Sequence, residues 1–409
     1  MEPVRLEQIR TRLYGRKRKK GQVAGMNEDT RFAGAARSGQ YVEQEDAPAD
    51  VPATKANDAQ GPEKETEVPG SDLKVAPAGA TETNAGALSL YNTDELEVMQ
   101  PAKEGARGFW NKATGGLLSL SPARKELEAR ALVNDQEQFE ALIRQSTWTR
   151  GVGVLIANKK GNAGKTPTCL TLAAILASVR GGSVAAVEFT DDKGQLAYRA
   201  EGDPALGVGE LARDLRKVKT QSQLRGYTVT QTSFASVIGS TSRSRPPLTG
   251  EDVTGVSRLI DDYFTMRLMD TGNQYSSSAF TGALSVTDVL VIPTMNSMDS
   301  VFDALELLEF LEHRGGKSAL LARTAIIVRL SDGRPEFKAS RIANFFLEKG
   351  ITDKQIFAVP YDEHIAERGE LSLKKLAEPT RHAFTAIAAA VVAQANKTIT
   401  EESLKENKS

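Results

Sequence analysis

The chain has 409 residues, and its 52 Lys and Arg residues nearly balance its 53 Asp and Glu residues, which gives a formal net charge of −1 at pH 7. This total neither favours nor excludes a polyanionic partner. One cysteine and three histidines exclude a disulfide framework and a Cys/His zinc site. The N-terminus lacks the apolar core of a signal peptide, and no apolar run approaches membrane-spanning length, so we expect a cytoplasmic protein.

The N-terminal part of the chain contains two segments of different composition. Residues 1–24 form a basic N-terminal peptide, and its apolar residues between Val4 and Leu13 have a spacing that fits a short amphipathic helix. Such a peptide could bind a partner protein, DNA or an acidic membrane. Residues 25–105 consist mainly of Ala, Pro, Gly, Glu, Asp and Thr. Because this composition cannot bury enough apolar surface to offset the entropy of ordering, it predicts a disordered, acidic linker.

The remainder of the chain shows the periodicities of regular structure. Residues 106–150 are predicted to form a helical arm, since apolar residues recur at helical spacing between Ala123 and Ile143. Apolar strand patterns then alternate with amphipathic helix patterns, which predicts an α/β domain over residues 151–395, with a mostly parallel sheet and helices on both faces. Residues 396–409 are expected to form a flexible tail. The expected strands are Val152–Ala157, Ser183–Phe189, Arg267–Met269, Val289–Pro293, Thr324–Val328 and Gln355–Val359, and the expected helices are 165–179, 250–264, 298–312, 338–349 and 379–395.

A phosphate-binding motif follows the first expected strand. Residues 159–166 read Lys-Lys-Gly-Asn-Ala-Gly-Lys-Thr and lead directly into a helical pattern. In such a loop, main-chain N–H groups and the helix N-terminus bind phosphates, Lys165 reaches the β- and γ-phosphates, and the Thr166 hydroxyl binds Mg²⁺. Pro167 is compatible with the first helical turn, where the N–H that it lacks would have no partner. The motif therefore predicts an ATP site formed by Lys160, Gly161, Asn162, Ala163, Gly164, Lys165, Thr166 and Pro167.

A second motif supports this interpretation. The expected strand Arg267–Met269 leads into Asp270-Thr271-Gly272. A carboxylate at the end of a buried strand can organise Mg²⁺, usually through a bound water, and Gly272 permits close approach of the backbone to the γ-phosphate. An alternative is that Asp270 only caps a helix or a turn. The order of the two motifs favours the first interpretation and predicts Thr166 and Asp270 as the metal-site residues.

The segment from Lys160 to Thr166 resembles the deviant Walker A signature of the ParA/MinD family, and the resemblance covers about residues 151–395. Gly194-Gln195-Leu196 and Arg199 are similar to an actinobacterial ParA/MinD-like branch. The resemblance implies a P-loop ATPase in which two ATP-bound subunits pack face to face, with Lys160 at the partner's phosphates. A cation there would stabilise both bound charge and transition-state charge. The alternative is that Lys160 is only an exposed loop residue.

The chain departs from the family pattern after its second expected strand. Relatives usually have Asp-x-Asp there, and the second aspartate positions the attacking water, whereas this chain has Glu188-Phe189-Thr190-Asp191-Asp192. Glu188 can replace the first carboxylate, but Thr190 cannot act as a base, so hydrolysis is expected to be slow or dependent on a partner. Asp191 or Asp192 could substitute through a shifted turn. The predicted catalytic residues are Lys160, Lys165, Asp270 and Glu188.

A second departure concerns the base of the nucleotide. Relatives often contact adenine with an asparagine after the sixth strand, but Val328-Arg329-Leu330-Ser331 offers none. Base recognition is then expected from the loop Val359-Pro360-Tyr361-Asp362. The nucleotide-binding residues predicted outside the phosphate loop are therefore Gly272, Pro360 and Asp362.

The resemblance also implies partners. We expect a homodimer with ATP, a ParB-like or other activating partner that binds the N-terminal peptide, and nonspecific DNA, which would give nucleoid association. Such DNA binding is electrostatic and falls as salt rises. Recruitment to a membrane is not expected, because residues 390–409 carry mixed charges rather than a basic amphipathic pattern. A basic cluster that could contact DNA, or could equally form solvated helix faces and loops, comprises Arg314, Lys317, Arg323, Arg329, Arg334, Lys338 and Arg341.

Three functions stay open at this point. The first is an ATPase that partitions plasmids or chromosomes or positions other cargo, and switches between a DNA-binding ATP dimer and a released monomer. The second is a nucleotide-gated scaffold with low turnover, accessory to a secretion or cell-surface assembly system, which Thr190 favours. The third is an ATP-dependent amidoligase or biotin-synthesis enzyme of the same superfamily. It would require a substrate pocket or a glutaminase domain, and the N-terminal composition offers neither.

Overall fold

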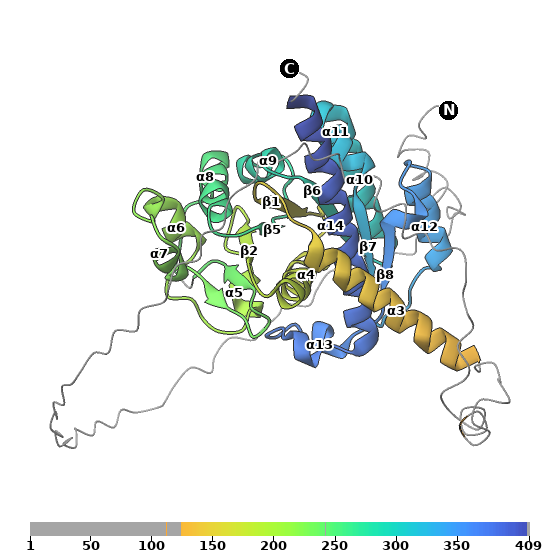
Figure 1. Cartoon of the computed structure of the whole chain (residues 1–409). Helices are drawn as coiled ribbons and strands as arrows, with labels where there is room; N and C mark the ends of the chain where they lie inside the picture. Colours follow the sequence, from red (N-terminus) through yellow and green to blue (C-terminus); the bar gives the residue numbers. More distant parts are fainter. Residues whose placement is uncertain (1–111, 113–123, 242, 407–409) are drawn as a thin grey trace, which may run out of the picture. The chain divides into compact units, whose positions relative to one another are not determined.

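The computed structural model describes residues 112, 124–241 and 243–406, which contain one eight-stranded sheet (Figure 1). The strand order is β3-β4-β2-β5-β1-β6-β7-β8. Neighbouring strands are parallel except β3 and β4, which form an antiparallel pair at one edge. The predicted peptide 1–24 and linker 25–105 lie outside the described residues. The strands are β1 (Val152–Ile156), β2 (Val184–Phe189), β3 (Val229–Thr230), β4 (Ser236–Ile238), β5 (Met266–Thr271), β6 (Val289–Met295), β7 (Ile326–Leu330) and β8 (Ile356–Val359).

Helices follow most of the strands and provide the crossovers that parallel neighbours require. Within the described part of the chain, no helix combines the length and the apolarity needed to cross a membrane. The helices are α3 (Arg124–Gln145), α4 (Lys165–Arg180), α5 (Leu196–Arg199), α6 (Val208–Asp214), α7 (Gln221–Arg225), α8 (Gly250–Asp261), α9 (Ser278–Ser285), α10 (Met298–Arg314), α11 (Gly316–Arg323), α12 (Ala339–Leu347), α13 (Glu363–Ala366) and α14 (Glu378–Glu406), with short 3-10 turns η2 (Asp353–Gln355) and η3 (Leu373–Lys375).

The helices cover both faces of the sheet (Figure 1). On one face α4 and α14 pack on the strands, and α3 packs on α4 and α14. On the other face α8, α9 and α10 contribute buried side chains such as Val256, Phe280 and Leu308. The central strands β1, β2 and β5 are buried along their whole length, as expected for parallel strands between two helical layers. The predicted fold class is therefore confirmed.

All six expected strands are present, but β3, β4 and several short helices were not predicted. β3 has two residues, and neither is fully buried, so it lacks the apolar run that would reveal it. α9 consists mostly of small residues. It packs closely on α8 through Gly282, where a Cβ would lie 2.6 Å from the Cα of Gly250. Such a helix carries no broad apolar stripe, and the periodicity of the sequence therefore misses it.

The predicted flexible tail is wrong for residues 396–406, because α14 continues through them without a break. The indole N–H of Trp148 donates to Asn396 Oδ1 at 2.7 Å. Ile399 packs against the same buried cluster as the rest of the helix. The apolar pattern weakens after residue 395, but tertiary contacts with the segment before β1 stabilise the extra turns. Residues 407–409 lie outside the described part.

Removal of residues 396–409 is expected to destabilise the domain. The truncation deletes the Asn396 and Ile399 contacts and the 2.5 Å ion pair between Arg150 and Glu402. We expect a loss of about 1–3 kcal/mol in the free energy of unfolding, which thermal denaturation would report as a Tm lower by about 2–8 °C. Removal of residues 407–409 alone is the control. An unchanged Tm after the longer truncation would mean that this end of α14 contributes nothing to the fold.

Candidate nucleotide-binding site

The predicted phosphate loop connects β1 to α4 at the carboxyl end of β1, which lies between β5 and β6 in the sheet. Asn162 and Gly164 have positive φ angles of 62° and 89°. The φ angle at position 164 favours glycine, and a Cβ there would also displace the end of the Leu330 side chain. Left-handed residues at a loop before a helix turn main-chain N–H groups toward a common point, which is the geometry of an anion site.

Asn158 anchors this loop, although no sequence motif indicated it. Its Nδ2 donates to the carbonyl oxygen of Pro293 in β6 at 2.8 Å. Its Oδ1 accepts from the main-chain N–H of Lys160 at 2.8 Å. The side chain is buried and thus ties the start of the loop to the neighbouring strand. In the sequence, only its position directly after an apolar strand pointed to this anchoring role.

Lys165 is the first residue of α4 and is 8% exposed. Its Nζ donates to the carbonyl oxygen of Lys160 at 3.0 Å and to Asn273 Oδ1 at 2.6 Å. Burial lowers the pKa of the ammonium to about 8, although the Asp270 carboxylate raises it. The side chain therefore folds back over the loop, where the motif predicts a phosphate group.

Asp270 lies beside the loop because β5 pairs with β1, with Asp270 in register with Ile156. Thr166 Oγ1 donates to Asp270 Oδ2 at 2.7 Å. The carboxyl group is buried, and burial raises its pKa to about 7, against the Thr166 hydrogen bond that lowers it, while Glu188 raises it further. Among the described residues, Asp270 Oδ1 has no hydrogen-bond partner although it is buried. The structure thus brings together the two predicted metal-site residues.

These residues fit a magnesium ion. A hydroxyl oxygen and a buried carboxylate oxygen without a partner are hard donors of the kind that Mg²⁺ prefers. No three His, Cys, Asp or Glu side chains in the described part of the chain cluster to hold a metal. Mg²⁺ does not need such a cage, because it generally binds one or two protein groups together with substrate phosphates and waters. Thr166 and Asp270 are the residues that would hold it, and the ion would neutralise phosphate charge.

Glu188 is fully buried in β2, in register with Asp270. Its Oε1 accepts from the main-chain N–H of Gly194 at 2.9 Å and from the Ser240 hydroxyl. Its Oε2 accepts from the main-chain N–H of Leu196 at 3.0 Å. Both oxygens are therefore engaged in holding the segment that follows β2. This arrangement favours a positioning role over the catalytic role that the sequence predicts, since an acceptor for a water proton is already occupied.

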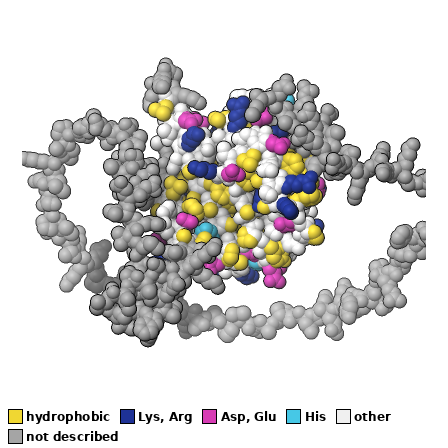
Figure 2. Space-filling model, turned by 90° about the vertical axis from the view of Figure 1, so that its right-hand side faces the viewer, with side chains coloured by type: hydrophobic (Ala, Val, Ile, Leu, Met, Phe, Trp, Pro, Cys, Tyr) yellow, Lys and Arg dark blue, Asp and Glu magenta, His cyan; other side chains and the backbone are white. Residues whose placement is uncertain are grey.

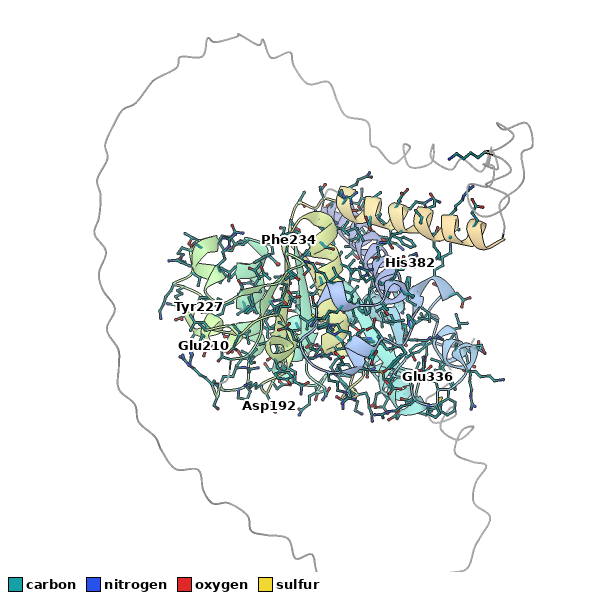
Figure 3. The ribbon with its side chains drawn as sticks, turned by 90° about the horizontal axis from the view of Figure 1, so that it is seen from below. Asp192, Glu210, Tyr227, Phe234, Glu336 and His382 are labelled. Atoms are coloured by element: carbon teal, nitrogen blue, oxygen red, sulfur yellow. The ribbon has the colours of Figure 1, made fainter. Side chains whose placement is uncertain are left out.

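The segment after β2 is held from outside by Arg245, which the sequence did not reveal. Its guanidinium donates to the carbonyl oxygens of Thr190, Asp191 and Asp192 at 2.9, 2.9 and 3.0 Å. The Thr190 hydroxyl is directed to the Asp192 carbonyl. Asp192 is exposed at the periphery (Figure 3), whereas Asp191 Oδ2 would lie 3.4 Å from a Cβ at Gly272. Asp191 and Asp192 were the two possible substitutes for the missing aspartate. Of these two residues, Asp191 lies beside the Asp270–Gly272 motif.

Lys160 points away from its own loop. Its Nζ lies 2.9 Å from Asp299 Oδ2 at the start of α10, and the two side chains are 39% and 59% exposed. Hydrogen bonds from Ser297 and Lys160 hold the pKa of Asp299 at about 2. The neighbouring Lys159 forms a similar pair with Glu306 at 2.7 Å. In the single chain, both loop lysines are thus bound to acidic residues of α10.

The CobQ/CobB/MinD/ParA nucleotide binding domain matches residues 154–373 of this chain. The chain belongs to this family. The matched range includes the phosphate loop, Asp270 and the segment that contains Asp362. The resemblance to the ParA/MinD family is therefore confirmed, and membership supports ATP and Mg²⁺ as the ligands of the site.

Distant relatives were found among curated proteins and solved structures. The chain is 22% identical to the ESX-1 secretion-associated protein EspI of Mycobacterium tuberculosis strain H37Rv. This match spans 280 residues, which are 67% of this chain and only 40% of that protein. It is 17% identical to a ParA family ATPase from Chlorobium tepidum TLS, over 62% of this chain and 98% of that chain, with a TM-score of 0.43. It is 16% identical to the septum site-determining protein MinD complexed with Mg-ADP from Pyrococcus horikoshii OT3. That match covers 58% of this chain and 94% of that chain, with a TM-score of 0.44. The domain match, rather than these likenesses, assigns the family.

The predicted base-contacting loop of this ParA/MinD-family protein follows β8. Asp362 is buried and caps α13, since Oδ1 accepts from the main-chain N–H groups of His364 and Ile365 at 3.0 and 3.3 Å. Its Oδ2 accepts from the N–H of Ala377 at 3.0 Å. A nucleotide contact of this carboxylate would compete with three main-chain hydrogen bonds, so capping accounts for the residue. Pro360 is exposed, and its predicted contact with the base stays a prediction.

One residue of the predicted basic cluster does not reach the surface. Arg329 is buried in β7, where it donates to the carbonyl oxygen of Ala339 at 2.9 Å. Arg314 and Arg341 stack on Phe310 and Phe337 respectively. On the one face that it presents, Figure 2 shows Lys and Arg side chains in several groups with acidic residues among them. A DNA-binding surface at this cluster stays a prediction, without Arg329.

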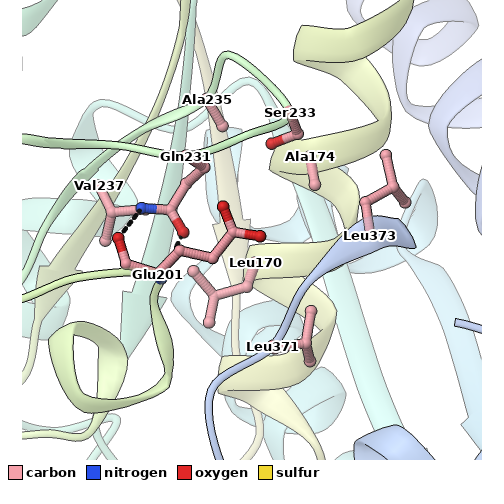
Figure 4. Close-up of a pocket in the computed structure, with 9 residues that line it drawn as sticks. All are labelled: Leu170, Ala174, Glu201, Gln231, Ser233, Ala235, Val237, Leu371 and Leu373. Atoms are coloured by element: carbon pink, nitrogen blue, oxygen red, sulfur yellow. Dashed lines mark hydrogen bonds between the residues drawn. The ribbon is translucent and has the colours of Figure 1, made fainter. Parts of the chain in front are cut away.

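Two cavities contain no residue of the predicted site. The first, about 10 Å³, lies beside α4 and β4, and Gln231 Nε2 donates there to the carbonyl oxygen of Glu201 at 3.3 Å (Figure 4). This volume suits a single water molecule. The second, about 290 Å³, lies between α11 and α14 and is lined by residues that include Leu320, Leu321 and Glu401. Neither cavity is a candidate for the nucleotide.

Asp270→Asn should reveal how much the buried carboxylate lowers the free energy of unfolding. The pKa of Asp270 is raised from 3.8 to about 7, so the folded state retains a proton that the unfolded state releases between these values. The contribution of Asp270 to stability therefore falls as pH rises through this window and is lowest above pH 7. Without nucleotide, the variant should gain more stability at about pH 8 than at about pH 5.5, by up to about 2 kcal/mol. Chemical denaturation at both pH values measures this, and equal gains would contradict a raised pKa.

The same variant should lose the Mg²⁺-dependent part of its nucleotide affinity. In the unchanged protein, the benefit of Mg²⁺ should decrease as pH falls below 7, because a protonated carboxyl binds magnesium poorly. Titration of ATP with and without Mg²⁺ at the two pH values provides the measurement.

Proposed function

We propose that this protein is an ATP-dependent switch, which dimerises when ATP and Mg²⁺ are bound and hydrolyses ATP slowly or on stimulation by a partner. The observation that carries the proposal is the contact of Thr166 at the start of α4 with the half-partnered carboxylate of Asp270, next to the buried Lys165. A cation, a hydroxyl and a carboxylate around a glycine loop are suited to bind a nucleoside triphosphate with its metal ion.

The environment of Lys160 supports the dimer. An exposed ion pair such as Lys160–Asp299 contributes about 0–1 kcal/mol. A multiply charged triphosphate of a second subunit offers a stronger partner for the same ammonium group. Lys160 can therefore leave Asp299 at little cost when an ATP-bound partner approaches. Dimerisation is then coupled to the presence of the triphosphate.

The segment after β2 supports slow turnover. Thr190 supplies no base, and Arg245 fixes the carbonyl groups on both sides of Asp191. Asp191 is the residue that we assign to the attacking water, since its carboxylate lies beside Gly272. A segment held by Arg245 presents this carboxylate in one fixed position. A partner that shifts the segment would then change the rate.

Two cellular roles fit such a switch. Partitioning or cargo positioning in the cytoplasm would need nonspecific DNA binding by the ATP dimer, and a ParB-like or other partner at the N-terminal peptide. An accessory role in secretion would need a nucleotide-gated scaffold with little turnover. The similarity to a secretion-associated protein and the absence of a base at Thr190 favour the second role. The burial of Arg329 removes one residue from the basic cluster that the first role would use.

Lys160→Ala should retain nucleotide binding but prevent ATP-dependent dimerisation. Lys165→Ala should abolish nucleotide binding, because the phosphates lose their buried cation. Asp299→Ala should shift dimerisation to an ATP concentration up to about fivefold lower, as the competing pair is worth about 1 kcal/mol at most. Light scattering and calorimetric titration provide the measurements, and Lys159→Ala is the matched control. Dimers that persist in Lys160→Ala would refute the role across the interface.

Gel-shift assays on random duplex DNA separate the two cellular roles. Partitioning requires binding that appears with ATP, disappears with ADP and weakens steeply as salt rises. Lys160→Ala is the control that binds ATP without forming dimers. Equal absence of binding with both nucleotides would leave the secretion-accessory role.

A further inference from the structure

We propose that the Asn273 carboxamide is an internal substitute for a phosphate group, which holds Lys165 in the nucleotide-free protein and is displaced when nucleotide binds. This inference rests on the proposed nucleotide site. It assigns a role to a residue outside both sequence motifs. It also makes the segment after β5 directly sensitive to occupancy of the phosphate loop.

The position of the carboxamide carries the inference. Asn273 Oδ1 accepts from Lys165 Nζ at 2.6 Å, while Asn273 Nδ2 would lie 3.6 Å from a Cβ at Gly161. The amide group thus spans the space between the glycine side of the phosphate loop and its lysine. A β- or γ-phosphate oxygen would need the same position on Lys165. The asparagine and the phosphate would therefore compete for the same ammonium group.

The energetics of Lys165 explain why a substitute is useful. A buried ammonium without an acceptor carries a large desolvation penalty. In the structure its acceptors are Asn273 Oδ1 and the Lys160 carbonyl. Asn273 itself is exposed, so its amide can turn into water when a ligand replaces it. An asparagine is neutral, and its bond to the ammonium is therefore weaker than that of a charged phosphate.

Displacement of Asn273 would change the mobility of the segment that contains it. Thr271 fixes the start of the segment, because its hydroxyl donates to the carbonyl oxygen of Ile156 at 2.9 Å. Tyr275 fixes the other side by stacking on Phe310 of α10, with ring centroids 4.4 Å apart. Asn273 lies between these two anchors. Its release from Lys165 therefore gives the segment freedom that it lacks without nucleotide.

Two substitutions at Asn273, with opposite expected effects on nucleotide affinity, test the proposal. Asn273→Ala removes the competitor, so affinity for both ADP and ATP should rise about threefold to tenfold. The Tm of the nucleotide-free protein should fall by about 2–4 °C, because Lys165 loses an acceptor. Asn273→Asp adds a charged competitor that also repels phosphate, and affinity should fall about tenfold or more. Gln274→Ala, at the next exposed position, is the control and should change neither quantity.

Calorimetric titration and thermal denaturation of the full chain give both readouts. Lower or unchanged affinity in Asn273→Ala, with normal binding by the unchanged protein, would overturn this proposal and leave the proposed function standing. Failure of the unchanged protein to bind either nucleotide would overturn both. Hydrogen exchange supplies a further readout, because residues 271–277 should exchange faster in Asn273→Ala than in the nucleotide-free, unchanged protein.

Discussion

Two buried charges of opposite sign, on Lys165 and Asp270, are the feature on which the rest of the site depends. Removal from water shifts both pKa values toward neutrality, to about 8 for the ammonium and about 7 for the carboxyl group. Each group has fewer partners than its charge requires, since Asp270 Oδ1 has none among the described residues. Such a pair lowers the stability of the protein without ligands. A phosphate with its metal supplies what both groups lack, so binding relieves a cost that folding has already imposed.

The sheet produces this pair by its register. Ile156, Glu188 and Asp270 lie side by side on β1, β2 and β5, so the segments that follow these strands meet at one edge. Asn158, Arg245 and Asn273 then fix these segments. Asn158 and Arg245 bind main-chain carbonyl groups, and Arg245 also lies 3.8 Å from the buried Glu188 carboxylate, whereas Asn273 binds the Lys165 ammonium. The site is thus positioned by side chains from separate segments of the chain.

The strength of the contacts separates the fixed parts of the protein from those that can change partners. Glu188 and Asp362 are buried and bind several main-chain N–H groups, and such contacts are costly to break. Lys160 and Asp299 form an exposed pair, which is cheap to exchange. Asn273 is also an exposed residue, although its bond to Lys165 is partly buried. The proposed switch therefore resides in the exposed contacts around the loop, while the buried ones maintain its frame.

The fold class, the phosphate loop and the aspartate at the end of β5 could be predicted from the amino-acid sequence alone. These features are local, because a contiguous run of residues or a strand with its following turn contains all the required chemistry. The contributions of Asn158, Arg245 and Asn273 were decided only by the tertiary structure. Arg245 bonds to Thr190, 55 positions earlier, and Asn273 bonds to Lys165 across 108 positions, and no local pattern encodes such a meeting. The same holds for the end of α14, where the partner of Asn396 is Trp148, 248 positions away. Glu188 is a further example, since its residue type suggested a catalytic role, whereas the main-chain groups packed around it favour a positioning role.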